Sequence, residues 1–498
     1  MSRSPEQEQE RERDAGLSSI GRKAGRGLGW SLLGTLVTKI GSLAMGLVLA
    51  RLLAPADFGL YAIALAASQF VMHINDAGII AATVQWRGKL EDMAPTAAVL
   101  AVSFSTAVYG IFWVIAPAFA RLAGNEAATP VVRLLTVIIL VDGLTAVRSG
   151  ALLRRFEQDK LTKANMVGFV ANAALAIPLA AGGAGAYSFA AGQVAASVVT
   201  GVLVFLAARL PVRIAVDREI AARLLRFGLP LAGSLGIESL LVNTDYVIVG
   251  DVLGPAALGY YLLAFNVSSW VPGLVGTAVR YVSVAGFSRL AENDPEALEL
   301  GVRRTVPLLV AGVLPAAVLM CTLAHEIVVF LYGAKWAPAA DALRFLAVLM
   351  VVRMLVSFAF DILTSIGATK WTVWVNLGWV VALVGALLAG THLAGIRGTA
   401  IGHAVVAVLV ALPLTAWALS RAGVRLWPVL PGLVRPLCGA ALAALVITVI
   451  AAVSAPLTGD LPVVELSVAG GAGLLVYVLV VVPMSRIRQL TTRVVRLI

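Results

Sequence analysis

The sequence predicts an all-α polytopic membrane protein with about 14 transmembrane helices, arranged as two six-helix lobes related by an internal repeat plus two extra C-terminal helices. Three observations predict this fold class. The 498 residues are 60% hydrophobic and only 13% charged, whereas soluble domains carry about 25% charged residues. A segment of the first half is similar in sequence to a segment of the second half. Basic residues are dense in alternate connections and sparse in the others.

The spans are predicted from windows that are apolar enough to cross a bilayer core, which needs about 20 apolar residues per helix. Windows 58–80 and 131–153 are the least apolar, because both carry charged residues in their interior. The predicted spans are residues 28–53, 58–80, 96–118, 131–153, 164–182, 186–208, 228–250, 256–283, 305–331, 340–365, 371–391, 397–420, 436–456 and 462–484.

The internal repeat is a turn between two spans. Residues 49–70 (LARLLAPADFGLYAIALAASQF) align without a gap with 249–270 (VGDVLGPAALGYYLLAFNVSSW), and 7 of the 22 positions are identical. In both copies a Pro is followed four residues later by a Gly; proline fixes φ and glycine relaxes it, which indicates a tight connection. Two further matches, at an offset of 211, are Arg133 with Arg344 and Asn165 with Asn376. Repeated apolar halves are typical of membrane transporters.

The placement of basic residues predicts that both termini are cytoplasmic. The N-terminal tail and the even-numbered connections are rich in Arg and Lys, and the odd-numbered connections hold only Arg51, Arg121, Lys335 and Arg397. This asymmetry is the positive-inside pattern. Anionic lipid headgroups suffice as partners for the basic loops, so no nucleic-acid binding is expected despite a net charge of +11.

The same pattern divides the chain into segments. The inter-lobe linker contains an Arg-rich stretch, 217–227, that is expected to form an amphipathic helix on the inner surface. The predicted segments are a disordered cytoplasmic tail (1–26), a first lobe with spans 1–6 (27–208), a cytoplasmic inter-lobe linker (209–227), a second lobe with spans 7–12 (228–420), spans 13 and 14 (421–484) and a basic cytoplasmic tail (485–498).

The sequence lacks the common motifs of enzymes. It contains no GxxxxGK[ST], no HExxH and no CxxC, and its four histidines are scattered. The external connections are short, which leaves little room for catalytic groups on the outer face. We therefore expect no catalytic residues, no metal site and no cofactor, and a protein that is not an enzyme.

Ionisable residues inside apolar spans are the positive functional evidence. A charge at the bilayer centre costs a few kcal/mol, so such residues face a polar cavity or a partner. Asp142 with Arg148, and Arg353 with Asp361, are equally compatible with structural ion pairs. The candidate cavity or ion-coupling residues are Asp76, Arg148, Glu238, Asp245, Arg353 and Asp361.

Two cations stand apart from these candidates. Lys39 lies in the middle of the first span, where snorkelling is difficult, and Arg280 lies late in the eighth. Cations that line a cavity suit a phosphate-bearing substrate, because charge-assisted hydrogen bonds to phosphate oxygens offset the cost of desolvation. Lys39 and Arg280 are therefore the predicted diphosphate-binding residues.

Several stretches resemble a known family. They are the two repeated turns with the preceding NTDYVIV (243–249), the segment from Arg280 through Ser288-Arg289-Leu290 to Asn293-Asp294-Pro295-Glu296, and LYGAKWAPAA (331–340). Together they are similar to Wzx-like lipopolysaccharide and exopolysaccharide flippases, of the polysaccharide-transport branch of the multidrug/oligosaccharidyl-lipid/polysaccharide exporter superfamily. The resemblance covers roughly residues 26–420. The family commonly has a Pro shortly after the position of Arg280, where this chain has YVSVAGF (281–287).

The resemblance implies a twelve-helix core in two lobes around a central cavity. Such proteins move polyprenyl-diphosphate-linked oligosaccharides across the bacterial cytoplasmic membrane by alternating access, and their cationic cavity residues hold the diphosphate. The implied partners are the lipid-linked oligosaccharide, the bilayer, and the polysaccharide polymerase and glycosyltransferases of the same pathway.

Two alternatives remain open at this stage. A multidrug exporter of the same superfamily would have the same topology, but its cavity would favour carboxylates and aromatic rings over cations. A membrane polysaccharide polymerase or glycosyltransferase is disfavoured by the short external loops and the two-half repeat.

Overall fold

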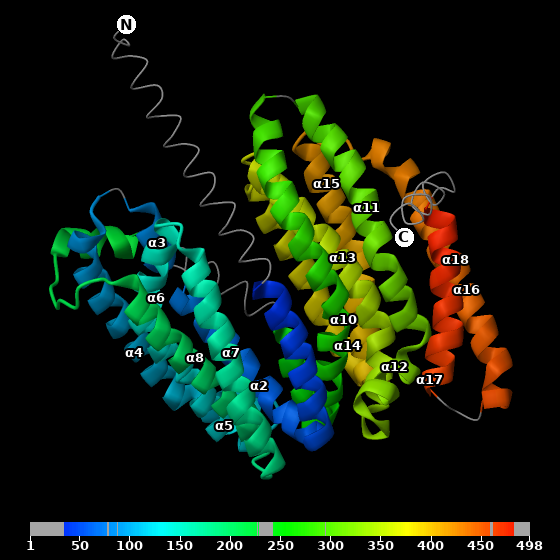
Figure 1. Ribbon diagram of the computed structural model, residues 1–498, viewed down its shortest axis with the longest axis horizontal. Helices are drawn as coiled ribbons and strands as arrows, with labels where there is room; N and C mark the ends of the chain where they lie inside the picture. Colours follow the sequence, from blue (N-terminus) through cyan, green and yellow to red (C-terminus); the bar gives the residue numbers. More distant parts are fainter. Residues whose placement is uncertain are drawn as a thin grey trace, which may run out of the picture. The chain divides into compact units, whose positions relative to one another are not determined.

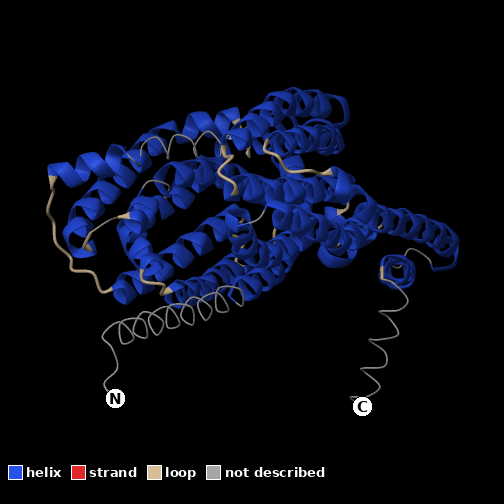
Figure 2. Ribbon diagram, turned by 90° about the horizontal axis from the view of Figure 1, so that it is seen from above, coloured by secondary structure: helices blue, strands red, loops and turns tan. Residues whose placement is uncertain are grey.

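The structure is a computed structural model that describes residues 34–482 apart from 77–78, 87, 227, 229–242, 294 and 459–461. The described part is helical and contains no strand, and twelve of its helices are long and apolar enough to cross a membrane (Figures 1 and 2). The all-α polytopic fold class is therefore confirmed. The chain divides into two compact units, 1–247 and 248–498.

The first unit contains the first six predicted spans. Its helices are an unlabelled first helix (Gly34–Leu52), α2 (Pro55–Asp76), α3 (Ile79–Gln85), α4 (Leu90–Leu122), η1 (Glu126–Ala128), α5 (Thr129–Thr136), α6 (Ile138–Arg154), α7 (Gln158–Ala181) and α8 (Ala186–Ala208). The predicted window 131–153 is divided between α5 and α6, and α6 packs against both α4 and α8. The predicted spans and the observed helices agree in order, with shifts of several residues at their ends.

The second unit contains the later spans. Its helices are α10 (Thr244–Asn293, whose first residues belong to the first unit), α11 (Pro295–Thr322), α12 (Ala324–Tyr332), η2 (Ala334–Trp336), α13 (Ala339–Ser365), α14 (Lys370–Val406), η3 (Ala407–Ala411), α15 (Leu412–Arg421), η4 (Trp427–Val429), α16 (Leu430–Thr458), α17 (Pro462–Glu465), η5 (Leu466–Gly470) and α18 (Gly471–Val481). The final helices pack on α11, where Tyr477 donates a hydrogen bond to the Ala311 carbonyl (2.9 Å). Predicted span 7, 228–250, lies mostly outside the described residues.

The repeated turn occurs at the expected place in both copies. In the first copy, the chain leaves the helix at Leu53 and α2 begins at Pro55. In the second copy, α10 breaks at Gly254, whose φ of 81° is a left-handed conformation that favours glycine. In both copies the repeated proline follows the break, so the same local sequence pattern produces the same connection between two helices.

Predicted spans 11 and 12 form a tight hairpin. Within α14, only Ala394 and Gly395 leave helical geometry. The two arms approach so closely that a Cβ on Gly398 would overlap the Gly390 carbonyl, and Thr391 and Thr399 share a buried hydrogen bond of 2.8 Å. Small residues four apart allow this approach of two backbones. The pattern Gly398-Thr-Ala-Ile-Gly402 supplies them.

One packing contact within the first unit has a counterpart within the second, at an offset of 210 residues. A Cβ on Gly192 would lie 2.8 Å from the Ala176 Cβ, and one on Gly402 would lie 2.6 Å from the Ala386 carbonyl oxygen. Predicted spans 5 and 6 in the first half, and predicted spans 11 and 12 in the second half, therefore meet at equivalent small residues. The internal repeat is present in the packing as well as in the sequence.

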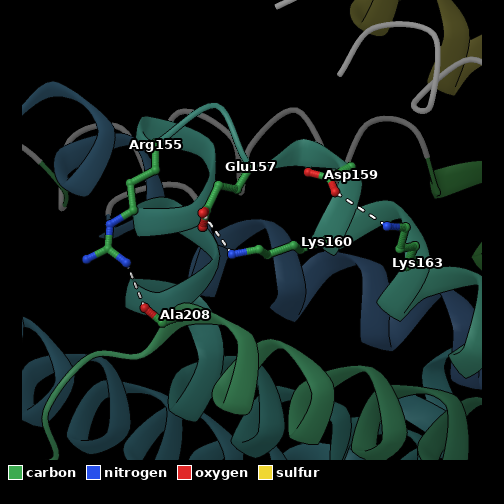
Figure 3. Close-up of polar contacts among 6 residues, drawn as sticks. All are labelled: Arg155, Glu157, Asp159, Lys160, Lys163 and Ala208. Carbon is green, nitrogen blue, oxygen red and sulfur yellow. Dashed lines mark hydrogen bonds and ion pairs between the residues drawn. The ribbon is translucent and has the colours of Figure 1, made fainter. Parts of the chain in front are cut away.

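Charged residues of the first unit gather where α6 passes into α7 (Figure 3). Arg155 donates to the Ala208 carbonyl (2.8 Å), one of the last carbonyls of α8, which have no partner within that helix. Lys160 pairs with Glu157 at 2.7 Å, and Lys163 pairs with Asp159 at 3.5 Å. The side chains of both pairs remain accessible to solvent, and pairs of this kind contribute little stability, about 0–1 kcal/mol each.

The inter-lobe linker is fixed to the first unit. The buried Thr96 of α4 accepts a hydrogen bond from the Asp217 backbone N–H (3.0 Å) and donates one to the Ala215 carbonyl (3.3 Å). Asp217 then caps the helix 218–226 by accepting from the N–H groups of Glu219 and Ile220. Leu224 of that helix is buried against α4 and α6. The predicted amphipathic helix is present; its placement on the membrane surface stays a prediction.

Candidate functional site

Lys39 is exposed in the first helix. The opposite side of that helix packs on α7, because Cβ atoms on Gly34 and Gly41 would overlap Thr162 and Phe169. At 3.6 residues per turn, Lys39 points roughly 150° away from those glycines. No ion pair to Lys39 occurs among the described residues. The lysine is thus presented on the face of the helix that is not covered by α7.

A polar network crosses the interior of the first unit. The buried Asn75 of α2 donates a hydrogen bond to the Asp142 carboxylate of α6 (2.7 Å) and accepts one from the Ser105 hydroxyl of α4 (2.7 Å). The amide therefore supplies one donor and one acceptor to two different helices. Asp142 is thus hydrogen-bonded to Asn75; the sequence left open whether Asp142 forms an ion pair with Arg148.

Replacing Asn75 by Ala is expected to lower the free energy of unfolding by about 2 kcal/mol, because Ser105 and Asp142 would each lose a partner in a buried place. The midpoint of thermal unfolding in detergent should fall by several degrees. Thr106→Val is the matched control, since the exposed Thr106 hydroxyl bonds only to the Val102 carbonyl of its own helix (2.7 Å). Equal midpoints for the two variants would remove the network as a source of stability.

Arg148 is buried, with 6% of its surface exposed, and its guanidinium carbon lies 3.6 Å from the centre of the Phe205 ring of α8. This stacking satisfies the face of the guanidinium and leaves its N–H groups in the plane. The Nε atom is buried and has no hydrogen-bond partner among the described residues. Arg148 therefore retains hydrogen-bonding capacity inside the unit.

The remaining candidates are spread over the chain. Arg353 of α13 lies 5.5 Å from the centre of the Phe265 ring, and its pairing with Asp361 stays a prediction. Asp245 is 1% exposed at the start of α10 and accepts the N–H of Tyr246 (2.9 Å). Glu238 and the side chains of Asp76 and Arg280 lie outside the described part. The suggested meeting of Lys39 and Arg280 in a cavity also stays a prediction.

The repeated tyrosine has a polar partner in each unit. Tyr61 of α2 accepts a hydrogen bond from Gln193 Nε2 of α8 (2.8 Å), and Tyr261 Oη of α10 lies 3.5 Å from His403 Nδ1 of α14. Buried phenols need a partner, and both tyrosines are buried. The partners come from equivalent spans at an offset of 210.

These partners were missed in the sequence, although a signal was present. Residues 190–193 are AAGQ and 400–403 are AIGH, so a small residue and a glycine precede the polar residue in both units. The glycines are those that pack on Ala176 and Ala386. Together they identify the second, fifth and sixth spans of each half as the ones that meet around the repeated tyrosine.

Comparison with known proteins finds relatives that are named for polysaccharide biosynthesis. It is 28% identical over 434 residues to the succinoglycan biosynthesis transport protein ExoT of Rhizobium meliloti (strain 1021), with 85% of each chain covered. It is 22% identical over 404 residues to the lipopolysaccharide biosynthesis protein WzxC of Escherichia coli (strain K12), covering 78% of this chain and 80% of that one.

Solved structures show the same fold at low identity. The lipid II flippase MurJ in its inward closed conformation matches with a TM-score of 0.75 and 13% identity, over 90% of this chain and 97% of that one. An inward-facing multidrug resistance MATE family transporter of the MOP superfamily matches with a TM-score of 0.61 and 19% identity, over 78% and 94%. The superfamily fold expected from the resemblance is therefore confirmed. The model of the family named polysaccharide biosynthesis protein matches residues 48–341, more than half of the sequence and both repeated turns, and the chain belongs to that family.

Proposed function

We propose that this protein flips a polyprenyl-diphosphate-linked oligosaccharide, a precursor of a cell-surface polysaccharide or lipopolysaccharide, from the inner to the outer leaflet by alternating access. The observation that carries the proposal is the family match together with an alignment to the transport protein ExoT over 85% of both chains. The fold shared with a lipid II flippase supports it. These relatives are named as transporters, in agreement with a role other than that of an enzyme.

The chemistry of the chain suits this cargo. A bilayer opposes the passage of a polar glycan, and a hydrated path lined by cations lowers that barrier while the lipid tail remains in the membrane. Lys39 is an exposed cation in the middle of an apolar helix, on the side not covered by α7. We assign Lys39 and Arg280 to the diphosphate, because charge-assisted hydrogen bonds to phosphate oxygens offset desolvation of the cations.

Coupling to an ion gradient is assigned to intramembrane carboxylates. Movement of H⁺ or Na⁺ down its gradient would supply the free energy for transfer, and Asp76, Glu238, Asp245 and Asp361 are the candidate coupling carboxylates. We place the protein in the bacterial cytoplasmic membrane with both termini in the cytoplasm, as the positive-inside pattern predicts. The polysaccharide polymerase and the glycosyltransferases of the same pathway are its proposed functional partners.

A leaflet-access assay tests the proposal. Purified protein is reconstituted into proteoliposomes with a lipid-diphosphate-linked oligosaccharide. The appearance of this oligosaccharide in the opposite leaflet is followed with a membrane-impermeant glycosidase. Transfer that exceeds that of protein-free liposomes is expected. Efflux of organic cations without transfer of any lipid-linked glycan would favour a multidrug exporter, and lengthening of glycan chains by the protein alone would favour a polymerase.

A further inference from the structure

A groove of about 310 Å³ lies at the linker-proximal end of the first unit, formed by α4, α6, α8 and the linker. Its wall on α4 extends from Ala94 to Ser103, about 14 Å along the helix axis. The lining is almost entirely apolar, and it contains two arginines and no carboxylate. None of it comes from the helix that carries Lys39. The groove therefore includes neither Lys39 nor any other residue of its helix.

Arg148 forms the inner charge of this groove. It lies six residues before the end of α6, which is about 9 Å from that end of the helix. Stacking on Phe205 fixes the guanidinium plane, and the buried Nε has no partner among the described residues. A buried cation with an unused donor is costly unless an anion is supplied from outside the unit. The lining provides no such anion.

Arg213 forms the outer charge. It lies in the exposed linker beside Val212 and Ile214, which also line the groove. The linker cannot move freely away, because Thr96 holds it to α4 through hydrogen bonds to Ala215 and Asp217. One arginine of the groove is thus buried, the other lies in the exposed linker, and the rest of the lining is almost entirely apolar.

We propose that this groove binds an anionic phospholipid of the cytoplasmic leaflet. The phosphate lies between the guanidinium groups of Arg148 and Arg213, and one acyl chain lies along α4 toward Ser103. The positive charge of the groove matches an anionic headgroup, and basic pockets between transmembrane helices on the cytoplasmic side are suited to such lipids. A free phosphate ion would satisfy the arginines but would leave the apolar wall empty. The proposal depends on membrane insertion and not on the transported cargo.

The test measures lipid binding by the full-length purified protein with native mass spectrometry. Dioleoyl phosphatidylglycerol, dioleoyl phosphatidylcholine and inorganic phosphate are the three probes. The wild type is expected to bind phosphatidylglycerol at least about tenfold more tightly than phosphatidylcholine, because the quaternary ammonium of phosphatidylcholine offsets the attraction of its phosphate to the two arginines. Arg148→Gln and Arg213→Gln should each lower the affinity for phosphatidylglycerol about tenfold.

Arg133→Gln is the matched control, because Arg133 also stacks on an aromatic ring, that of Trp113 (4.6 Å), but lies outside the groove. It should bind lipid as the wild type does. If Arg148→Gln fails to fold, the exposed Arg213→Gln decides the outcome alone. Equal affinity for both lipids, or unchanged affinity in the groove variants, would overturn the proposal. Displacement of phosphatidylglycerol by inorganic phosphate at comparable concentration would show that the groove binds a free anion and not a lipid, which would also overturn the proposal.

Discussion

Lys39→Ala is expected to lower the rate of lipid-linked oligosaccharide transfer at least about tenfold, while the protein remains folded. A hydrogen bond to a charged group contributes about 1.5–3 kcal/mol, and each 1.4 kcal/mol is a factor of ten. Lys39 is exposed, so its loss leaves no cavity in the packed interior. The measurement is the leaflet-access assay in proteoliposomes, with folding checked by gel filtration and circular dichroism.

Two variants separate a role in binding from a general effect of charge. Lys39→Arg keeps the cation and should retain most of the transfer. Lys89→Ala removes an exposed lysine at the start of α4 and should leave transfer unchanged. Transfer by Lys39→Ala at the wild-type rate would exclude Lys39 from the substrate path, and the function would then be judged from the wild-type protein alone. The same comparison with Arg280→Ala tests the second proposed cation.

Gly398→Val is expected to destabilise the second unit by about 3 kcal/mol, the upper part of the range for overpacking. The added Cβ would overlap the backbone of Gly390, which cannot move aside as a flexible side chain does. The Thr391–Thr399 hydrogen bond lies beside this contact and would be lost with it. The midpoint of thermal unfolding, followed by fluorescence-detected gel filtration, should fall strongly.

Gly385→Val is the control for this prediction, because it makes the same chemical change in the same helix. A Cβ on Gly385 meets nothing within 4 Å. Its midpoint should remain close to that of the wild type. A Gly398→Val protein as stable as this control would show that the two arms of α14 can separate without cost.

Features that depend on local sequence could be predicted. The apolar windows gave the helices, and the Pro and Gly of the repeated turn gave the breaks at Leu53 and Gly254. The resemblance gave the superfamily fold, and the MurJ match agrees with it. These properties follow from the run of residues along one helix or one turn, so no knowledge of distant neighbours was required.

Partners between helices could not be predicted in this way. Asp142 and Arg148 lie six residues apart on α6, and the sequence left open whether they form a structural ion pair or face a cavity. The structure ties Asp142 to Asn75, 67 residues away, and stacks Arg148 on Phe205. Which neighbour a side chain meets depends on how helices rotate against one another. The rotation of one helix against another cannot be deduced from a single sequence. An exception is a repeat such as AAGQ and AIGH, in which the same contact residues occur in both halves.

The hydrogen bonds between the linker and α4 limit where the chain can be divided into two co-expressed fragments. Residues 209–217 are anchored through Thr96, and the following helix buries Leu224 in the first unit. A cut inside 209–217 would therefore separate the first fragment from part of its own core. A pair of co-expressed fragments should therefore be divided after residue 226, so that the amino-terminal piece keeps both the linker contacts with Thr96 and the buried Leu224.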